Sequence, residues 1–180
     1  TIAAALQQYF LNDNTACYVL TGDNYPHRIP MRNDEERLNV YNESGEDGLR
    51  GYLGTPEEID FDRINKELSE FKAGKDIIEI KHMGREDGDI SYDETDFTGI
   101  KVLILEWTHG GSEYLKGVDI PVFLESSPEE TKARRIKRGR DENAASPFIC
   151  RVVELEQEKL DLQSKNARIV VGKDGKVYEQ

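Results

Sequence analysis

The sequence is poor in cysteine, methionine and tryptophan, with two, two and one of these residues among 180. Cys17 lies in a predicted core strand and Cys150 in a predicted helix, so two unpaired thiols are expected rather than a disulfide. Absence of a disulfide framework argues against a small secreted scaffold and suits a reducing compartment. We therefore expect a cytoplasmic location.

Positive charge is also scarce, with 24 lysines and arginines against 36 aspartates and glutamates and a net charge of -12. This balance argues against a nucleic-acid partner, because duplex phosphates require a basic face. It still allows a local basic pocket for a small phosphorylated ligand. No apolar run is long enough to span a bilayer and no secretory signal pattern is present, so no membrane partner is expected.

Three catalytic signatures are missing as well. The 180 residues contain no Cys/His set with zinc spacing, no G-x-S-x-G nucleophile elbow and no G-x-x-x-x-G-K-[ST] phosphate-loop motif. What remains must be read from the order of the predicted elements and from the polar residues that follow the strands.

Apolar periodicity predicts short buried strands that alternate with helices. Predicted strands are 16–20, 101–107, 119–125 and 167–172, with a hairpin of 77–82 and 89–93. Predicted helices are 1–11, 32–43, one capped by Asp60 and stopped by Gly74, and two opened by Ser127 and Ser146, while the glycine-rich stretch 44–56 is predicted as a loop. This alternation predicts one α/β domain over 1–180, with a mainly parallel sheet between two helical layers.

Ligands in such folds bind beyond the carboxyl ends of the strands. Asp23 follows the strand at 16–20, where a carboxylate can accept a proton from a bound hydroxyl. The alternative is an ordinary turn, since Gly-Asp-Asn is common turn chemistry. Asp23 is therefore the first catalytic candidate.

Two candidates lie at the end of the strand at 101–107 or just after it. Glu106 ends the apolar run VLILE, where a carboxylate can bind Mg²⁺ directly or through water. Its alternative is a strand-end residue that faces solvent. His109 is a candidate on the substrate side, although a loop histidine is its more ordinary interpretation.

A basic cluster at 132–140, KARRIKRGR, runs against the overall acidity of the chain. Guanidinium groups gathered in this way are typical of sites that bind phosphate. The alternative is a solvated helix face paired with neighbouring glutamates and aspartates. Near the tip of the predicted hairpin, Arg85 can either reach a substrate or simply decorate the turn.

Several stretches, in this order, carry a resemblance to a known family. They are GDNYPHR, DFDRINKELSEFKAGK, the hairpin with Arg85, VLILEWTHG, VDIPVFLESSPEETKARRIKRGRDE and SPFICRVVELEQEKLD. Together they cover most of 1–162 and resemble the uridine kinase and phosphoribulokinase family of P-loop kinases. The resemblance implies a P-loop NTPase-like three-layer fold with a small substrate-side β-hairpin and a lid in 132–146.

The same resemblance implies transfer of the γ-phosphoryl group of Mg²⁺-ATP to a hydroxyl of a nucleoside, sugar or similar alcohol. Asp23 would activate the acceptor, Glu106 would place Mg²⁺ and Arg138 would stabilise the transferred phosphoryl group. The implied acceptor-binding residues are Tyr25, His27, Arg28 and Arg85, and the implied ATP-binding residues are Thr1, Arg134, Arg135 and Arg140. His109 has no firm counterpart in the family and stays a substrate-binding candidate from its place after the strand alone. Trp107 stands where the family usually has glycine, which implies an altered acceptor pocket.

The opening stretch TIAAAL resembles the helix that directly follows a phosphate loop, with Thr1 at the end of that motif. We therefore expect a preceding strand and loop of about 15–30 residues that end in Gly-Lys-Ser or Gly-Lys-Thr. The alternatives are an inactive relative that acts as a nucleotide- or partner-binding module, and an adenylylsulfate-kinase-like or shikimate-kinase-like enzyme. The sequence fixes neither the acceptor nor the oligomeric state, and it is compatible with a homodimer.

Overall fold

The computed structural model describes residues 2–127, 129–131, 133 and 146–180. They form two compact units. Unit 1 comprises Thr1–Asn33, Pro56–Gly110 and Tyr114–Val118, and unit 2 comprises Asp34–Thr55, Gly111–Glu113 and Asp119–Gln180. None of the described helices is both long and apolar enough to cross a membrane.

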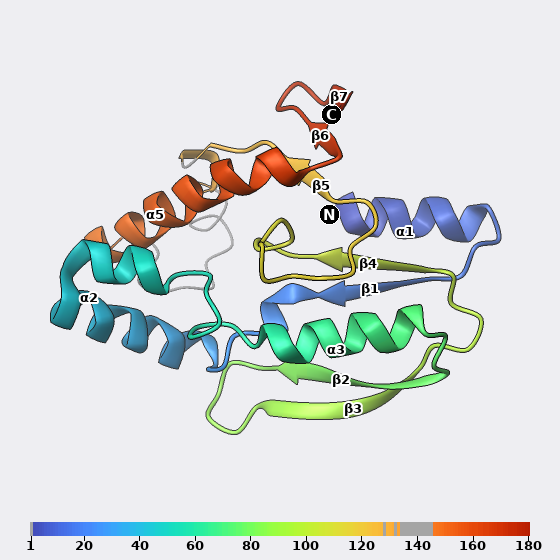
Figure 1. The fold of residues 1–180 in the computed structure, drawn as a ribbon, viewed down its shortest axis with the longest axis horizontal. Coiled ribbons are helices and arrows are strands. Elements are labelled where there is room, and N and C mark those ends of the chain that lie inside the picture. The colour runs from blue at the N-terminus through green and yellow to red at the C-terminus, as the bar shows by residue number, and fades with distance from the viewer. Residues whose placement is uncertain (1, 128, 132, 134–145) are drawn as a thin grey trace. The chain divides into compact units, whose positions relative to one another are not determined.

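The centre of unit 1 is a parallel pair of apolar strands, β1 (Cys17–Thr21) and β4 (Val102–Glu106). Helix α1 (Ile2–Asn12) packs on this pair from one side, and α3 (Phe61–Lys72) lies on the other (Figure 1). A short connection joins α1 to β1, so the helix runs antiparallel to the strands. The first turn of α1 therefore lies at the strands' carboxyl end.

Helix α3 forms where its local sequence predicts it. The Asp60 side chain accepts a hydrogen bond from the Arg63 amide at 3.0 Å, and Gly74, with φ of 74°, follows the helix end. Ile64 and Leu68 are buried in the core of unit 1, four residues apart on one helix face. The capping residue, the apolar spacing and the glycine after the last turn thus all indicate the same helix.

The hairpin of unit 1 pairs β2 (Ile77–Met83) with β3 (Ile90–Asp96) in an antiparallel register from Ile77 opposite Asp96 to Met83 opposite Ile90. This confirms the predicted hairpin. Ile78 and Ile80 of β2 are buried in the same core as α3, whereas β3 is largely exposed. The hairpin therefore covers the core with β2 and presents β3 to solvent.

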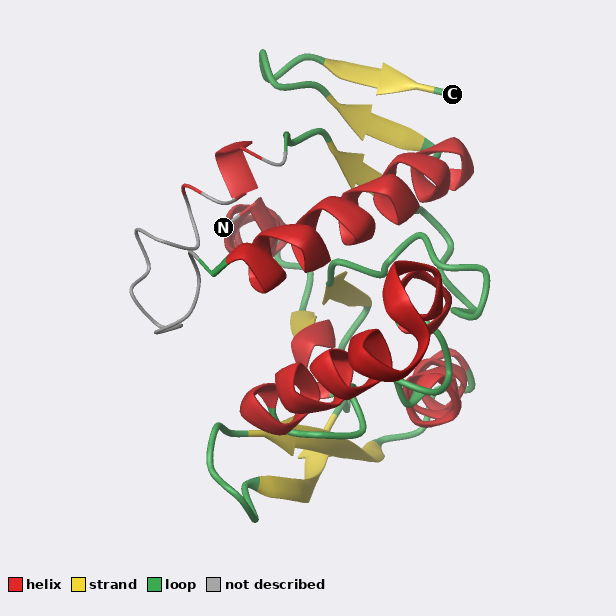
Figure 2. Cartoon of the chain, turned by 90° about the vertical axis from the view of Figure 1, so that its left-hand side faces the viewer, coloured by secondary structure: helices red, strands yellow, loops and turns green. Residues whose placement is uncertain are grey.

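Unit 2 is built from two helices and a small sheet (Figure 2). It contains α5 (Pro147–Gln163) and all but the first turn of α2 (Pro30–Tyr52). Its sheet has the order β5 (Val122–Leu124), β6 (Ile169–Val171), β7 (Val177–Glu179), with β5 parallel to β6 and β7 antiparallel to it. The described residues also include two short 3₁₀ turns, η1 (Gly22–Asn24) in unit 1 and η2 (Ser164–Asn166) in unit 2.

Two helix starts in unit 2 confirm the predicted capping residues. The Ser146 hydroxyl accepts from the Ile149 amide at 3.2 Å at the start of α5. Ser127 and Glu130 form a reciprocal capping box, with side chain-to-amide distances of 3.3 and 3.0 Å.

The predicted loop at 44–56 is wrong. Helix α2 continues to Tyr52, interrupted only at Gly45, whose φ of 67° and ψ of -163° break the helical backbone. Leu49 and Leu53 have no exposed surface because they pack against Val152 and Leu155 of α5. Contacts with residues more than 90 positions away in sequence thus stabilise a helix where the local richness in glycine favours a loop.

Candidate active site

Two carboxylates stand at the same end of the β1–β4 pair. Thr21 and Glu106 are opposite each other in the parallel register, and the turn η1 follows directly with Asp23. Both Asp23 and Glu106 are exposed. The first turn of α1 lies at the same end. The two carboxylates and this helix turn can therefore bind a hydroxyl, a cation and a phosphate at one edge of unit 1.

The segment after Asp23 is held by backbone pairing with 58–60. The Tyr25 carbonyl accepts from the Asp60 amide at 2.8 Å, and the His27 amide donates to the Glu58 carbonyl at 2.9 Å. The His27 ring nitrogen Nε2 lies 3.0 Å from the Pro56 carbonyl oxygen. An isolated antiparallel bridge between Pro26 and Ile59 thus attaches residues 25–27 to 58–60.

Tyr25 does not face the site. Its side chain has no exposed surface, and its hydroxyl donates to the Glu67 carboxylate, which also accepts from Arg63 Nε at 2.6 Å. Burial raises the pKa of both Tyr25 and Glu67 above their ordinary values. The predicted contact of Tyr25 with a substrate is therefore not what this conformation provides: the ring anchors the segment to α3 from inside the core.

Lys81 is a second anchor, and sequence reasoning missed it. Its side chain is 2% exposed, and Nζ donates to the Pro26 carbonyl at 2.8 Å. Burial lowers the pKa of Lys81. Alternation along β2 places Ile78 and Ile80 on the buried face and Lys81 on the opposite face with Ile77 and Glu79, which are exposed. A lysine at this position is therefore expected to face solvent, and only the fold shows its buried partner.

The remaining predicted acceptor residues of unit 1 lie near the hairpin tip or the start of α2. Arg28 is half-buried, and Arg85 is exposed at the tip, where its backbone amide donates to Asp89 Oδ2 at 3.1 Å. Arg32 forms a two-pronged ion pair with Asp87, at 3.0 and 2.5 Å. The hairpin tip is thereby attached to the first turn of α2, on the same segment that carries Arg28.

An aromatic cluster closes the carboxyl end of β4. Trp107 packs edge-on to His109, with ring centres 5.6 Å apart, and against Phe61 at 5.5 Å. His109 is buried, with 7% of its surface exposed. His109 therefore packs against Trp107, which itself keeps part of its surface open, and its predicted substrate contact stays a prediction.

The predicted ATP-binding residues and one predicted catalytic residue lie outside the described residues. They are Thr1, Arg134, Arg135, Arg138 and Arg140. The lid predicted for 132–146 falls largely on the same stretch. Their assignments stay predictions.

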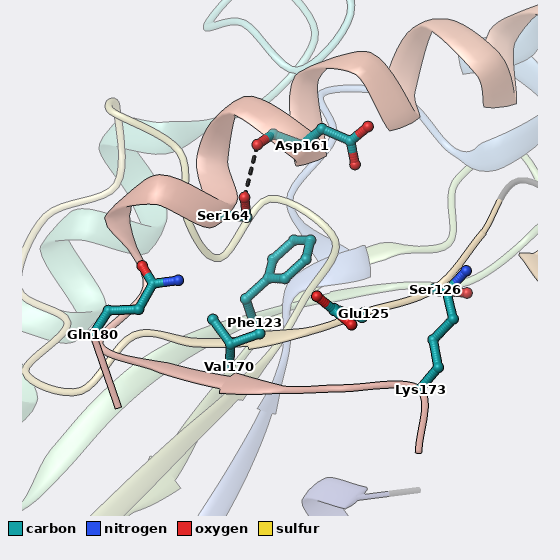
Figure 3. Close-up of a pocket in the computed structure, with 8 residues that line it drawn as sticks. All are labelled: Phe123, Glu125, Ser126, Asp161, Ser164, Val170, Lys173 and Gln180. Atoms are coloured by element: carbon teal, nitrogen blue, oxygen red, sulfur yellow. Dashed lines mark hydrogen bonds between the residues drawn. The ribbon is translucent and has the colours of Figure 1, made fainter. Parts of the chain in front are cut away.

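Unit 2 contains a separate cavity of about 360 Å³ (Figure 3). Its lining is Phe123, Glu125, Ser126, Asp161, Ser164, Val170, Lys173 and Gln180. Glu125 and Lys173 follow the parallel strands β5 and β6, so this hollow also lies toward the carboxyl ends of strands. None of the residues predicted to act lines it.

Comparison with known proteins identifies the fold of this chain. No family model matches the chain. The solved structure of phosphoribulokinase from Rhodobacter spheroides superposes with a TM-score of 0.72 at 13% identity, over 96% of this chain and 65% of that one. The chain has a phosphoribulokinase-like fold. The predicted α/β fold is thereby confirmed, and the predicted resemblance holds at the level of the fold.

A curated relative is much closer in sequence to this phosphoribulokinase-like chain. It is the bifunctional alpha-galactosidase/sucrose kinase AgaSK of Mediterraneibacter gnavus, 74% identical over all 180 residues. The chain spans 19% of that relative's length.

Proposed function

We propose that the chain is the acceptor-side part of an ATP-dependent sugar kinase, with sucrose as the first acceptor to test. One pairing carries the proposal: 74% identity to a protein named as a sucrose kinase coincides with a phosphoribulokinase-like fold. AgaSK is also named as an alpha-galactosidase. The fold of these 180 residues favours the kinase half of that name.

In the proposed reaction, the oxygen of the acceptor hydroxyl attacks the γ-phosphorus of ATP, and Asp23 accepts the proton of that hydroxyl. The bond from the γ-phosphorus to the bridging oxygen breaks, and ADP leaves with that oxygen. Asp23 suits this role because it is exposed in the turn directly after β1. General-base assistance of this kind contributes about 10²–10⁴ in rate.

Glu106 is the residue that would hold Mg²⁺. Within the described residues, no group of three or more His, Cys, Asp and Glu side chains is arranged to hold a metal. One exposed carboxylate fits a cation that takes most of its oxygen ligands from water and phosphate, as Mg²⁺ does in kinases. Bound there, Mg²⁺ would neutralise charge on the phosphates of ATP.

Residues upstream of Thr1 would supply the phosphate loop. Among the described residues, β4 pairs with β1 on one edge only, although its four aliphatic residues are typical of a strand inside a parallel sheet with both faces covered. An open edge on such a strand leaves backbone N–H and C=O groups unpaired. We infer that a preceding strand pairs with the open edge of β4 and ends in a loop at the first turn of α1. The amides and dipole of that turn favour phosphate.

The test is ADP formation by the full-length protein with Mg²⁺-ATP and sucrose, compared with Asp23→Asn. We expect kcat to fall by about 10²–10⁴ in Asp23→Asn. Asp13→Asn is the matched control, because Asp13 is exposed in the turn at the opposite end of β1. Its kcat should stay within about twofold of wild type.

Full activity of Asp23→Asn would remove the base assignment. Binding of Mg²⁺-ATP without ADP formation, with sucrose, other sugars or nucleosides, would instead favour a nucleotide-binding module.

A further inference from the structure

We propose that Trp107 forms an aromatic wall of the acceptor site and makes the enzyme prefer ring-shaped sugars over open-chain alcohols. This inference rests on the proposed kinase function and names a residue that sets its substrate class. It is carried by where the indole lies, by how firmly it is held and by what such a surface binds.

The indole lies beside the candidate base. Trp107 follows Glu106 at the end of β4, and its ring covers the backbone of Gly22, which directly precedes Asp23. A Cβ atom added at position 22 would lie 1.9 Å from Trp107 Cγ. Only glycine leaves room for this contact, so the turn that carries Asp23 and the indole are fitted to one another.

The indole is also held in place. Its ring centre lies 6.2 Å from that of Tyr25, 5.5 Å from that of Phe61 and 5.6 Å from that of His109. These three neighbours are buried, with 0%, 3% and 7% of their surfaces exposed. Trp107 itself is only half-buried. A rigid support therefore carries an aromatic side chain that still offers surface at the carboxyl end of the strands.

Such a surface suits a sugar ring. The face of an aromatic ring is electron-rich, and the C–H groups on one side of a pyranose or furanose ring can lie flat on it. Binding sites commonly combine aromatic walls of this kind with a few polar groups that fix orientation. Here the exposed carboxylate of Asp23 would take the hydroxyl while the indole takes the ring. An open-chain polyol presents no flat face.

The experiment compares Trp107→Leu and Trp107→Phe in the full-length protein, with sucrose, glucose and glycerol as acceptors. We expect Trp107→Leu to lower kcat/KM for the two sugars by tenfold or more, mainly through KM. Its kcat/KM for glycerol and its KM for ATP should change by less than about twofold. Trp107→Phe keeps an aromatic face and should recover most of the sugar activity.

Tyr9→Leu is the matched control, because Tyr9 is 68% exposed on α1, within the same unit, and lies toward the end of the helix away from the site. Equal losses for sugars, glycerol and ATP in Trp107→Leu would overturn the inference and leave Trp107 a purely structural residue. The same holds if Trp107→Phe behaves like Trp107→Leu.

Calorimetric titration with sucrose in the absence of ATP separates the two proposals. One outcome is that the wild type binds sucrose, Trp107→Leu binds it more weakly, and no assay shows ADP formation. This outcome supports the aromatic wall and refutes the kinase. Equal binding by both proteins refutes the wall. Absence of binding and turnover in the wild type with sucrose, glucose and the other sugars tested refutes both.

Discussion

At the scale of single residues, Lys81 shows how a buried charge can serve a site that it does not touch. Its ammonium group donates to the Pro26 carbonyl, three residues after Asp23, while the rest of the side chain is packed inside unit 1. Burial penalises the charged form, which is why the pKa of Lys81 falls. What this buried group provides is its hydrogen bond to Pro26, on the segment that follows Asp23.

Lys81→Met therefore separates position from stability. Methionine fills similar space without a charge, so the free energy of unfolding should change by less than about 1 kcal/mol. The Pro26 carbonyl loses its donor and the segment near Asp23 shifts, so kcat should fall by about 10- to 100-fold. Steady-state kinetics of the full-length protein and urea unfolding give the two quantities.

Lys75→Met is the control for this change, since Lys75 is exposed and its ammonium group pairs with Glu70 on the surface at 3.0 Å. It should alter neither quantity measurably. A large loss of stability in Lys81→Met with unchanged kcat would show that Lys81 holds the core and not the site.

At the scale of elements, two of the three glycines of α2 stand in opposite circumstances. Gly45 has a φ of 67°, in the region that favours glycine, while Gly51 lies within the helical part of α2. A Cβ atom at either position would meet no atom within 4 Å. Any effect of alanine must therefore come from the backbone and not from packing.

We expect Gly45→Ala to lower the free energy of unfolding by about 1 kcal/mol, since alanine is strained at that φ. Gly51→Ala should raise it by about 0.5–1 kcal/mol, because alanine favours the helix. Urea unfolding of the two variants measures both values. Changes of the same sign would contradict a break confined to Gly45.

What the sequence could predict in these elements was local. Helix starts are predicted by Asp60, Ser146 and the Ser127–Glu130 pair, because each capping contact joins residues close together in sequence. The apolar run at 102–105 predicts a buried strand. The second half of α2 could not be predicted, because its stability comes from distant residues of α5. For the same reason, sequence suggested Tyr25 as a ligand contact, and only the fold brings Glu67 to its hydroxyl.

At the scale of the whole molecule, the fold class followed from the alternation of strands and helices, but the division into sheets did not. The described residues form three separate small sheets, of which two contain a parallel pair. Each carboxylate candidate was predicted from its place after a strand, and the register of β1 with β4 puts both at one end. Which strands pair with each other depends on the tertiary structure, and no local sequence pattern determines it.

The proposed upstream strand makes a prediction for β4 in the full-length protein. Successive residues of a parallel strand direct their N–H groups to opposite edges. Hydrogen exchange across Val102–Glu106 should therefore be slow at every residue if a second strand pairs with β4. Fast exchange at alternate residues would show that the edge stays open.

The contact between Gly22 and Trp107 constrains how these two positions can change over generations. Any larger residue at 22 collides with the indole, so position 22 can vary only after position 107 has become small. In the reverse direction, a tryptophan can arise at 107 only while 22 is glycine. The order of substitution is thus fixed, and a shift in acceptor preference through position 107 is reversible only until position 22 gains a side chain.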